Sequence, residues 1–121
     1  MILPDTSVWV EHFRRGQQTL MALLEDADIV MHPFVVGELA LGQLPRRAEI
    51  LKELDRLPQA TVADTGEVLG FIDRHRLAGT GLGYVAVHLL ASSRLTSDTL
   101  LWTFDKRLHA VADRLSLAAK R

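Results

Sequence analysis

The class of fold is indicated by TGLGYVAVHLLASSRL, residues 80–95, and LLWTFDKRL, residues 100–108. The first segment opens with a glycine-punctuated turn and continues in the pattern of a helix. The second is an apolar run, typical of a buried strand, that ends at the carboxylate of Asp105. A helix, a buried strand and a further helix in succession are typical of an α/β protein.

The rest of the chain repeats this alternation. Strands are predicted for three more apolar runs, at residues 1–3, 28–32 and 60–63. Helices are predicted from apolar residues at helical spacing, at residues 6–16, 17–27, 34–42, 45–57, 64–79 and 104–115. Pro45 is expected in the first turn of its helix, and Asp64 is expected to form a capping box with Glu67. Strands separated by helices predict a parallel sheet with helices on both faces.

The length and composition of the chain are those of one globular domain, which we expect to span residues 1–121. The net charge of −1 gives no overall attraction for nucleic acid, so a polyanion would need a local basic patch. The lack of cysteine excludes disulfides, thiolate zinc sites and a cysteine nucleophile. No apolar run approaches the roughly 20 residues that cross a bilayer, and the N-terminus does not read as a signal peptide. We therefore expect a cytoplasmic protein with no membrane partner.

Three acids follow predicted strands. Asp5 and Asp105 come directly after the first and last strands, and Glu38 lies about one and a half turns into the helix after residues 28–32. Ligands in open α/β sheets bind beyond the carboxyl ends of the strands, so these acids are candidates for one site. Such hard oxygen ligands suit Mg²⁺ or Mn²⁺. The alternative is that Asp5 and Asp105 only cap helices and that Glu38 lies on a solvent-exposed helix face.

Four motifs together carry a resemblance to a known family. They are PDTSVWVEHFR at residues 4–14, GELALG at 37–42, GLGYVAVHLLAS at 81–92 and LWTFDKRL at 101–108. In this order and spacing the chain resembles the PIN-domain ribonucleases, specifically the VapC toxins of bacterial toxin–antitoxin pairs. The resemblance implies a three-layer α/β/α fold with a central parallel sheet, and a Mg²⁺- or Mn²⁺-dependent endoribonuclease activity. It also implies a cognate VapB-like antitoxin and a homodimer.

The resemblance assigns roles to residues that match the family motifs. Asp5, Glu38 and Asp105 match family acids, and the resemblance implies that they are catalytic and hold the metal. The small polar residues that match positions around these acids would orient metal-bound water: Thr6, Ser7 and Thr103.

Ala86 departs from the family pattern. The pattern reads G-x-G-Y-V-D-x-H-L-L, whereas this chain reads GLGYVAVHLL, so Ala86 replaces the third acid. We expect an incomplete metal site and an impaired or weakened enzyme. Two explanations stay open: an Asp-to-Ala variant made to disable a harmful toxin, or a natural relative that has lost activity or binds metal weakly. We favour the first because alanine, the best helix former, removes the chemistry and spares the fold.

A second class of function stays open beside the nuclease. The chain could act as a catalytically dead module that captures an antitoxin and takes part in autoregulation. Two apolar helices, at residues 6–13 and 37–44, could form the groove for an antitoxin helix.

Basic side chains are needed wherever RNA approaches acidic residues. The candidates for RNA contact are Lys106 and Arg107, which directly follow Asp105, and Arg14. The alternative is that these cations lie on solvated helix faces. Trp9 and Trp102 lie in apolar runs and are expected in the core, not as platforms for stacked bases.

Overall fold

Two short parallel strands, β1 (Ile2–Pro4) and β2 (Leu100–Trp102), form the centre of the computed structural model, which describes residues 1–120. They pair in register, with Ile2 opposite Leu100 and Pro4 opposite Trp102. All three residues of β1 are buried, as are the last two of β2. Burial on both faces is typical of a parallel sheet that is covered by helices.

Single bridges extend this sheet on both sides. Ile29 pairs with β1, Met31 pairs with Gln59, and Ala118 pairs with β2 at Leu101, all in parallel. The predictions of full strands at residues 28–32 and 60–63 are therefore wrong.

The chain leaves the extended path too early for a regular ladder to form in either segment. The first segment runs directly into the helix that begins at Pro33. In the second, the amide of Thr61 donates to the hydroxyl of Thr96 instead of a neighbouring strand.

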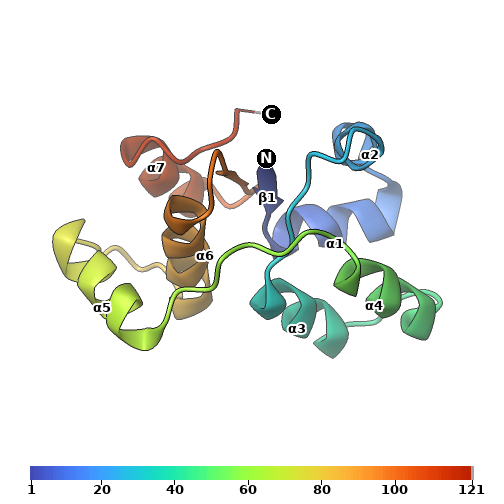
Figure 1. Ribbon diagram of the computed structural model, residues 1–121, viewed down its shortest axis with the longest axis horizontal. Helices are drawn as coiled ribbons and strands as arrows, with labels where there is room; N and C mark the ends of the chain where they lie inside the picture. Colours follow the sequence, from blue (N-terminus) through green and yellow to red (C-terminus); the bar gives the residue numbers. More distant parts are fainter. Residues whose placement is uncertain (121) are drawn as a thin grey trace.

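Seven helices surround the strands within the described residues, and they confirm the α/β fold. Their bounds are α1 (Thr6–Arg15), α2 (Gln18–Glu25), α3 (Pro33–Leu41), α4 (Arg47–Asp55), α5 (Thr65–Arg74), α6 (Tyr84–Leu95) and α7 (Lys106–Arg114). Figure 1 shows α1 to α4 on one side of β1 and α5 to α7 on the other. No helix of residues 1–120 has the length and apolar character needed to span a membrane.

Side-chain caps fix where most of these helices start. The predicted capping box is confirmed, since Asp64 accepts from the amide of Glu67 and the Glu67 carboxylate accepts from the amide of Asp64. The prediction for Pro45 is wrong, because α4 begins two residues later. Arg46 has a φ of 45° and lies in the left-handed region, which separates Pro45 from the helix.

Both tryptophans belong to the core, as the sequence predicts. Trp9 and Trp102 are each 2 % exposed, and their indole N–H groups have no hydrogen-bond partner. Apolar residues of the strands and of every helix pack with them in a single cluster. This core fixes the relative positions of β1, β2 and the helices that carry the candidate site.

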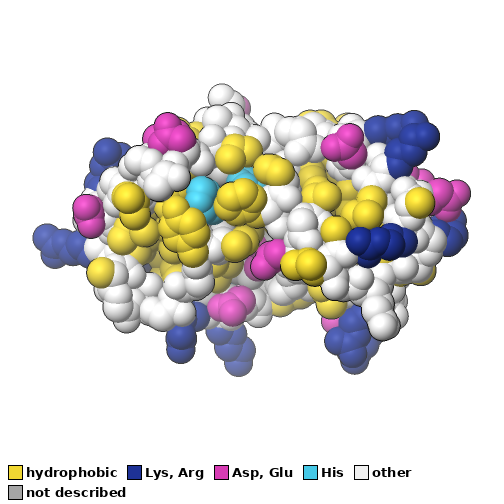
Figure 2. Space-filling model, turned by 90° about the horizontal axis from the view of Figure 1, so that it is seen from below, with side chains coloured by type: hydrophobic (Ala, Val, Ile, Leu, Met, Phe, Trp, Pro, Cys, Tyr) yellow, Lys and Arg dark blue, Asp and Glu magenta, His cyan; other side chains and the backbone are white. Residues whose placement is uncertain are grey.

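An exposed aromatic cluster joins α3 and α6. The ring of His88 lies 4.6 Å from that of Phe34 and 4.7 Å from that of Tyr84, measured between centroids. His88 is buried, whereas Phe34 is 36 % exposed and Tyr84 is 50 % exposed. Hydrophobic side chains beside histidine are also visible on the face shown in Figure 2.

Candidate functional site

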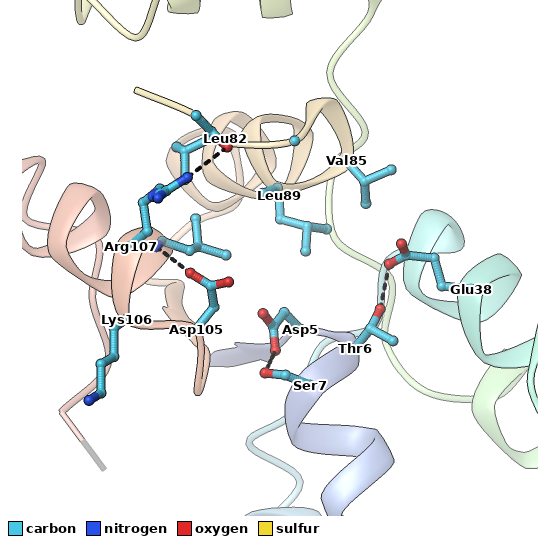
Figure 3. Close-up of a pocket in the computed structure, with 14 residues that line it drawn as sticks. Asp5, Thr6, Ser7, Glu38, Leu82, Val85, Leu89, Asp105, Lys106 and Arg107 are labelled. Carbon is cyan, nitrogen blue, oxygen red and sulfur yellow. Dashed lines mark hydrogen bonds between the residues drawn. The ribbon is translucent and has the colours of Figure 1, made fainter. Parts of the chain in front are cut away.

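An open pocket of about 620 Å³ lies at the carboxyl ends of β1 and β2. Its walls come from α1, α3, the turn before α6, α6 itself and α7. Of the residues singled out in the sequence, it is lined by Asp5, Thr6, Ser7, Glu38, Ala86, Asp105, Lys106 and Arg107. Figure 3 shows Asp5 between Asp105 on one side and Glu38 on the other. This is where α/β folds bind their ligands.

Asp5 is the buried acid of the pocket, with 7 % of its surface exposed. Its amide donates to the carbonyl of Trp102, which ties the end of β1 to β2. Its carboxylate caps α1 by accepting from the amide of Val8 at 3.3 Å. Burial raises the pKa of Asp5 above its usual value, and the hydrogen bonds that the carboxylate accepts oppose part of this shift. A helix cap alone needs no such burial, so the capping interpretation explains only part of its environment.

Two hydroxyls hold the Asp5 carboxylate in place. Ser7 donates to Oδ1 and Thr103 donates to Oδ2, each at 2.5 Å. Each hydroxyl also accepts from the backbone after β2: Ser7 from the amide of Phe104 and Thr103 from the amide of Asp105, both at 3.0 Å. Both hydroxyl protons are thus directed at Asp5, which is bound through them to the turn that carries Asp105. The water-orienting role expected for these residues stays a prediction.

Glu38 belongs to the opposite wall of the pocket. It is exposed on α3, and its Oε1 accepts a hydrogen bond of 2.5 Å from the hydroxyl of Thr6 at the start of α1. Each of the three small polar residues from the sequence motifs therefore orients a carboxylate. Thr6 holds the acid on α3, whereas Ser7 and Thr103 hold the acid at the end of β1.

Asp105 caps α7 while facing the same pocket. Its Oδ1 accepts from the amide of Leu108 at 2.8 Å, so Asp105 is a helix cap as well as a residue that lines the pocket. Among residues 1–120, no hydrogen bond uses its second oxygen. One carboxylate oxygen of Asp105 is thus free for a ligand.

Ala86 is the third residue of α6 and lies in the first turn of that helix. It lines the pocket together with the apolar side chains of Leu82, Val85 and Leu89. Figure 3 shows Val85 and Leu89 extending from α6 toward the acids. The wall that α6 contributes is therefore apolar, and a carboxylate at position 86 would make it acidic.

Comparison with known protein families matches residues 2–114 to the PIN domain. The chain belongs to the PIN-domain family. It is also 45 % identical, over 118 residues, to the protein named "Ribonuclease VapC32" from two strains of Mycobacterium tuberculosis, CDC 1551/Oshkosh and ATCC 25618/H37Rv. Each alignment covers 98 % of this chain and 95 % of the relative. The family resemblance seen in the sequence motifs is thereby confirmed.

The donor chemistry of this PIN domain fits a hard divalent cation, because carboxylate oxygens are the preferred ligands of Mg²⁺ and Mn²⁺. A cation beside Asp5 would also offset the cost of burying its charge. Within residues 1–120, however, no three acidic or histidine side chains form a group close enough to hold one ion. Asp5, Glu38 and Asp105 share the pocket without forming such a group, so the metal site expected on them stays a prediction.

The predicted RNA contacts are not all brought to the pocket. Lys106 and Arg107 line it, but Figure 3 shows the Lys106 side chain extending away from the acids. Arg14 lies elsewhere, in a groove of about 220 Å³ between α1 and α3. That groove adjoins the pocket, since Glu38 lines both.

Sequence reasoning missed the part of the site that carries no charge. Leu82, Val85 and Leu89 have the spacing of ordinary core residues, so nothing in the pattern distinguishes them. Gly81 carried a signal, because a G-x-G turn before a helix suggests a special backbone conformation. Its φ is 81°, and its carbonyl accepts a hydrogen bond from Arg107.

Proposed function

We propose that this PIN domain is the toxin of a bacterial toxin–antitoxin pair and that its function is to cut RNA with the help of Mg²⁺ or Mn²⁺. The observation that carries the proposal is the pocket at the strand ends, with the buried Asp5 between Glu38 and Asp105. The 45 % identity to a relative named as a ribonuclease supports the substrate class.

In this mechanism the residues of the chain position the reacting groups. Asp5 and Asp105 would hold the ion directly, and Glu38 would do so directly or through water. When bound, Mg²⁺ or Mn²⁺ would supply Lewis acidity toward the scissile phosphate and lower the pKa of the attacking water. Ser7 and Thr103 keep the Asp5 carboxylate fixed, as positioning residues.

Ala86 should impair this reaction. With one acid fewer, the site has lower affinity for the ion and less control over its position, so cleavage is slow. Ala86→Asp is expected to raise metal-dependent cleavage of a total RNA pool by orders of magnitude. Ala48→Asp is a matched control, because Ala48 is exposed in the first turn of α4 and gains the same charge outside the pocket.

The comparison has two informative results. Faster cleavage with Ala86→Asp alone supports the proposed nuclease and the vacated ligand position. If Ala86→Asp and Ala48→Asp cut RNA at the same rate as the parent chain, position 86 is not part of a metal site and the proposed mechanism is wrong.

The second candidate function is an antitoxin-binding module without catalysis. The groove between α1 and α3 favours it, because Val10, Phe13, Leu39 and Leu44 give that groove an apolar lining. An amphipathic helix of a VapB-like antitoxin fits such a groove through its apolar face. Val10 is 39 % exposed, so Val10→Asp should weaken capture of the antitoxin encoded next to this chain without unfolding the protein. Unchanged capture would contradict this use of the groove.

The proposed homodimer concerns a different face. Phe34 and Tyr84 expose aromatic surface around His88, as a contact between two copies would require. Sedimentation of the parent chain and of Tyr84→Ser tests it. We expect the parent to sediment as a dimer and the variant to dissociate at a higher protein concentration than the parent. A monomeric parent would contradict the homodimer.

A further inference from the structure

The guanidinium group of Arg107 is held over the turn that precedes α6. Its Nη1 donates to the carbonyl of Gly81 at 3.4 Å, and Figure 3 shows the side chain extending from α7 toward this turn beside Leu82. No carboxylate of residues 1–120 lies within ion-pair distance of Arg107. Arg107 is thus a cation at the edge of an acid-lined pocket with no acid as its partner.

Gly81 makes room for this arrangement. A Cβ atom at position 81 would overlap Nη1 of Arg107 and lie 3.2 Å from its Cζ. Nη1 is the far end of a flexible side chain, so a larger residue at position 81 would relieve this overlap by displacing Arg107, in addition to the backbone strain that the φ of 81° imposes on any residue but glycine. The missing side chain of Gly81 therefore determines where the guanidinium lies.

Gly79 offers a matched comparison within the same turn. Its φ is 79°, against 81° for Gly81, so both positions favour glycine for the same conformational reason. A Cβ atom at position 79 would meet nothing within 4 Å. The two glycines differ in one respect that matters here: only Gly81 borders Arg107.

We propose that Gly81 positions Arg107 as the contact for an RNA phosphate at the mouth of the pocket. This inference rests on the proposed function, which supplies RNA as the substrate. A phosphate that approaches Asp5 and Asp105 is repelled by their charge, and a cation beside it offsets that repulsion. The neighbouring Lys106 extends away from the acids in Figure 3, which leaves Arg107 as the cation best placed to do so.

The chemistry of arginine suits this task. The planar guanidinium carries five N–H donors and binds phosphate in a two-pronged geometry. The single long bond to the Gly81 carbonyl occupies one donor and is weak enough to be exchanged for a charged acceptor. Arg107 is thus oriented before RNA arrives, without being neutralised.

The test is the binding of a short fluorescent single-stranded RNA, measured with Mg²⁺ over a range of salt concentrations. Arg107→Gln is expected to weaken binding about tenfold and to reduce the salt slope by about 0.7, the value for one phosphate contact to a single strand. Arg107→Lys should keep the salt slope with intermediate affinity. Gly81→Ala should weaken binding by a similar factor, while Gly79→Ala should bind RNA like the parent. Both glycine variants should lower the melting temperature, because both positions have a positive φ.

A double variant separates positioning from general strain. Gly81→Ala combined with Arg107→Gln should bind no more weakly than Arg107→Gln alone, because both changes remove the same contact. Unchanged binding by Arg107→Gln would overturn the inference and leave the nuclease proposal standing. Equal weakening by Gly79→Ala and Gly81→Ala would overturn the positioning role of Gly81. If neither the parent nor Ala86→Asp binds RNA, the proposed function fails and this inference fails with it.

Discussion

Single residues of this protein are held by buried polar contacts. Asp5 accepts from Ser7 and Thr103, and His32, with none of its surface exposed, accepts from the amide of Phe34 and bonds to the hydroxyl of Ser92. A buried charge or polar group that loses such a partner costs more free energy than an exposed one. A substitution that removes one of these hydrogen bonds should therefore produce a measurable loss in the free energy of unfolding.

The hydroxyl of Thr103 provides the first prediction. Thr103→Val removes the hydrogen bond to Oδ2 of Asp5, which leaves a buried carboxylate short of a donor, and also removes the acceptor for the amide of Asp105. The free energy of unfolding should therefore fall by about 2 kcal/mol. The pKa of Asp5 should rise further. Thr99→Val is the control, because the equally buried Thr99 donates only to the neutral carbonyl of Ser97 and should cost about 1 kcal/mol. Denaturant unfolding measures both, and equal losses would contradict the link to Asp5.

His32 provides the second prediction. Burial, and then the neighbouring His88, lower the pKa of His32 to about 4 in the folded chain. Between pH 6.5, the ordinary pKa of histidine, and pH 4, the unfolded chain therefore binds a proton at His32 that the folded chain does not bind. The stability that depends on neutral His32 is complete above pH 6.5 and is lost as the pH falls toward 4. We expect a loss on the order of 2 kcal/mol between pH 8 and pH 5.

His32→Asn tests this dependence, because asparagine can still cap α3 but does not titrate. The variant should unfold more easily at pH 8, yet its stability should change much less between pH 8 and pH 5. A smaller slope will remain, since burial also lowers the pKa of His12, His75 and His88. An unchanged pH slope in His32→Asn would show that His32 does not cause the acid sensitivity.

At the scale of elements, the helices were readable from the sequence and the sheet was only partly so. Apolar spacing located every helix, and Asp64 with Glu67 marked the start of α5. The bridges at Ile29, Gln59 and Ala118 depend on which segments meet in space, which local pattern does not encode. The site divides in the same way: acids after strands were predictable, whereas the apolar wall of α6 resembles ordinary core.

The capping box gives the prediction at this scale. Asp64→Ala removes the acceptor for the amide of Glu67 at the first turn of α5 and should lower the free energy of unfolding by about 1 kcal/mol. Asp73→Ala, near the other end of the same helix, should be neutral or slightly stabilising, because an acid is unfavourable near a helix C-terminus. Thermal unfolding of both variants measures these changes, and an equal loss of stability in Asp64→Ala and Asp73→Ala would contradict the capping role.

At the scale of the whole molecule, the candidate site exists only in the folded chain. The hydrogen bond from Thr103 to Asp5 joins residues 98 positions apart, and Glu38 reaches the pocket from a third segment. An ion that binds these acids together therefore binds the folded state and stabilises it by mass action. Metal affinity and stability should thus change together when an acid is added at position 86.

The most direct test of the metal site is thermal unfolding of the parent chain, Ala86→Asp and Ala48→Asp, with and without Mn²⁺. Without metal, Ala86→Asp should melt below the parent, because its new carboxylate repels Asp5 and Asp105. With Mn²⁺, the melting temperature of Ala86→Asp should rise more than that of the parent or of Ala48→Asp. The difference in melting temperature between Ala86→Asp and the parent should therefore become smaller or change sign. If Mn²⁺ raises all three melting temperatures equally or not at all, the pocket is not a metal site that lacks one ligand, and the central claim is wrong.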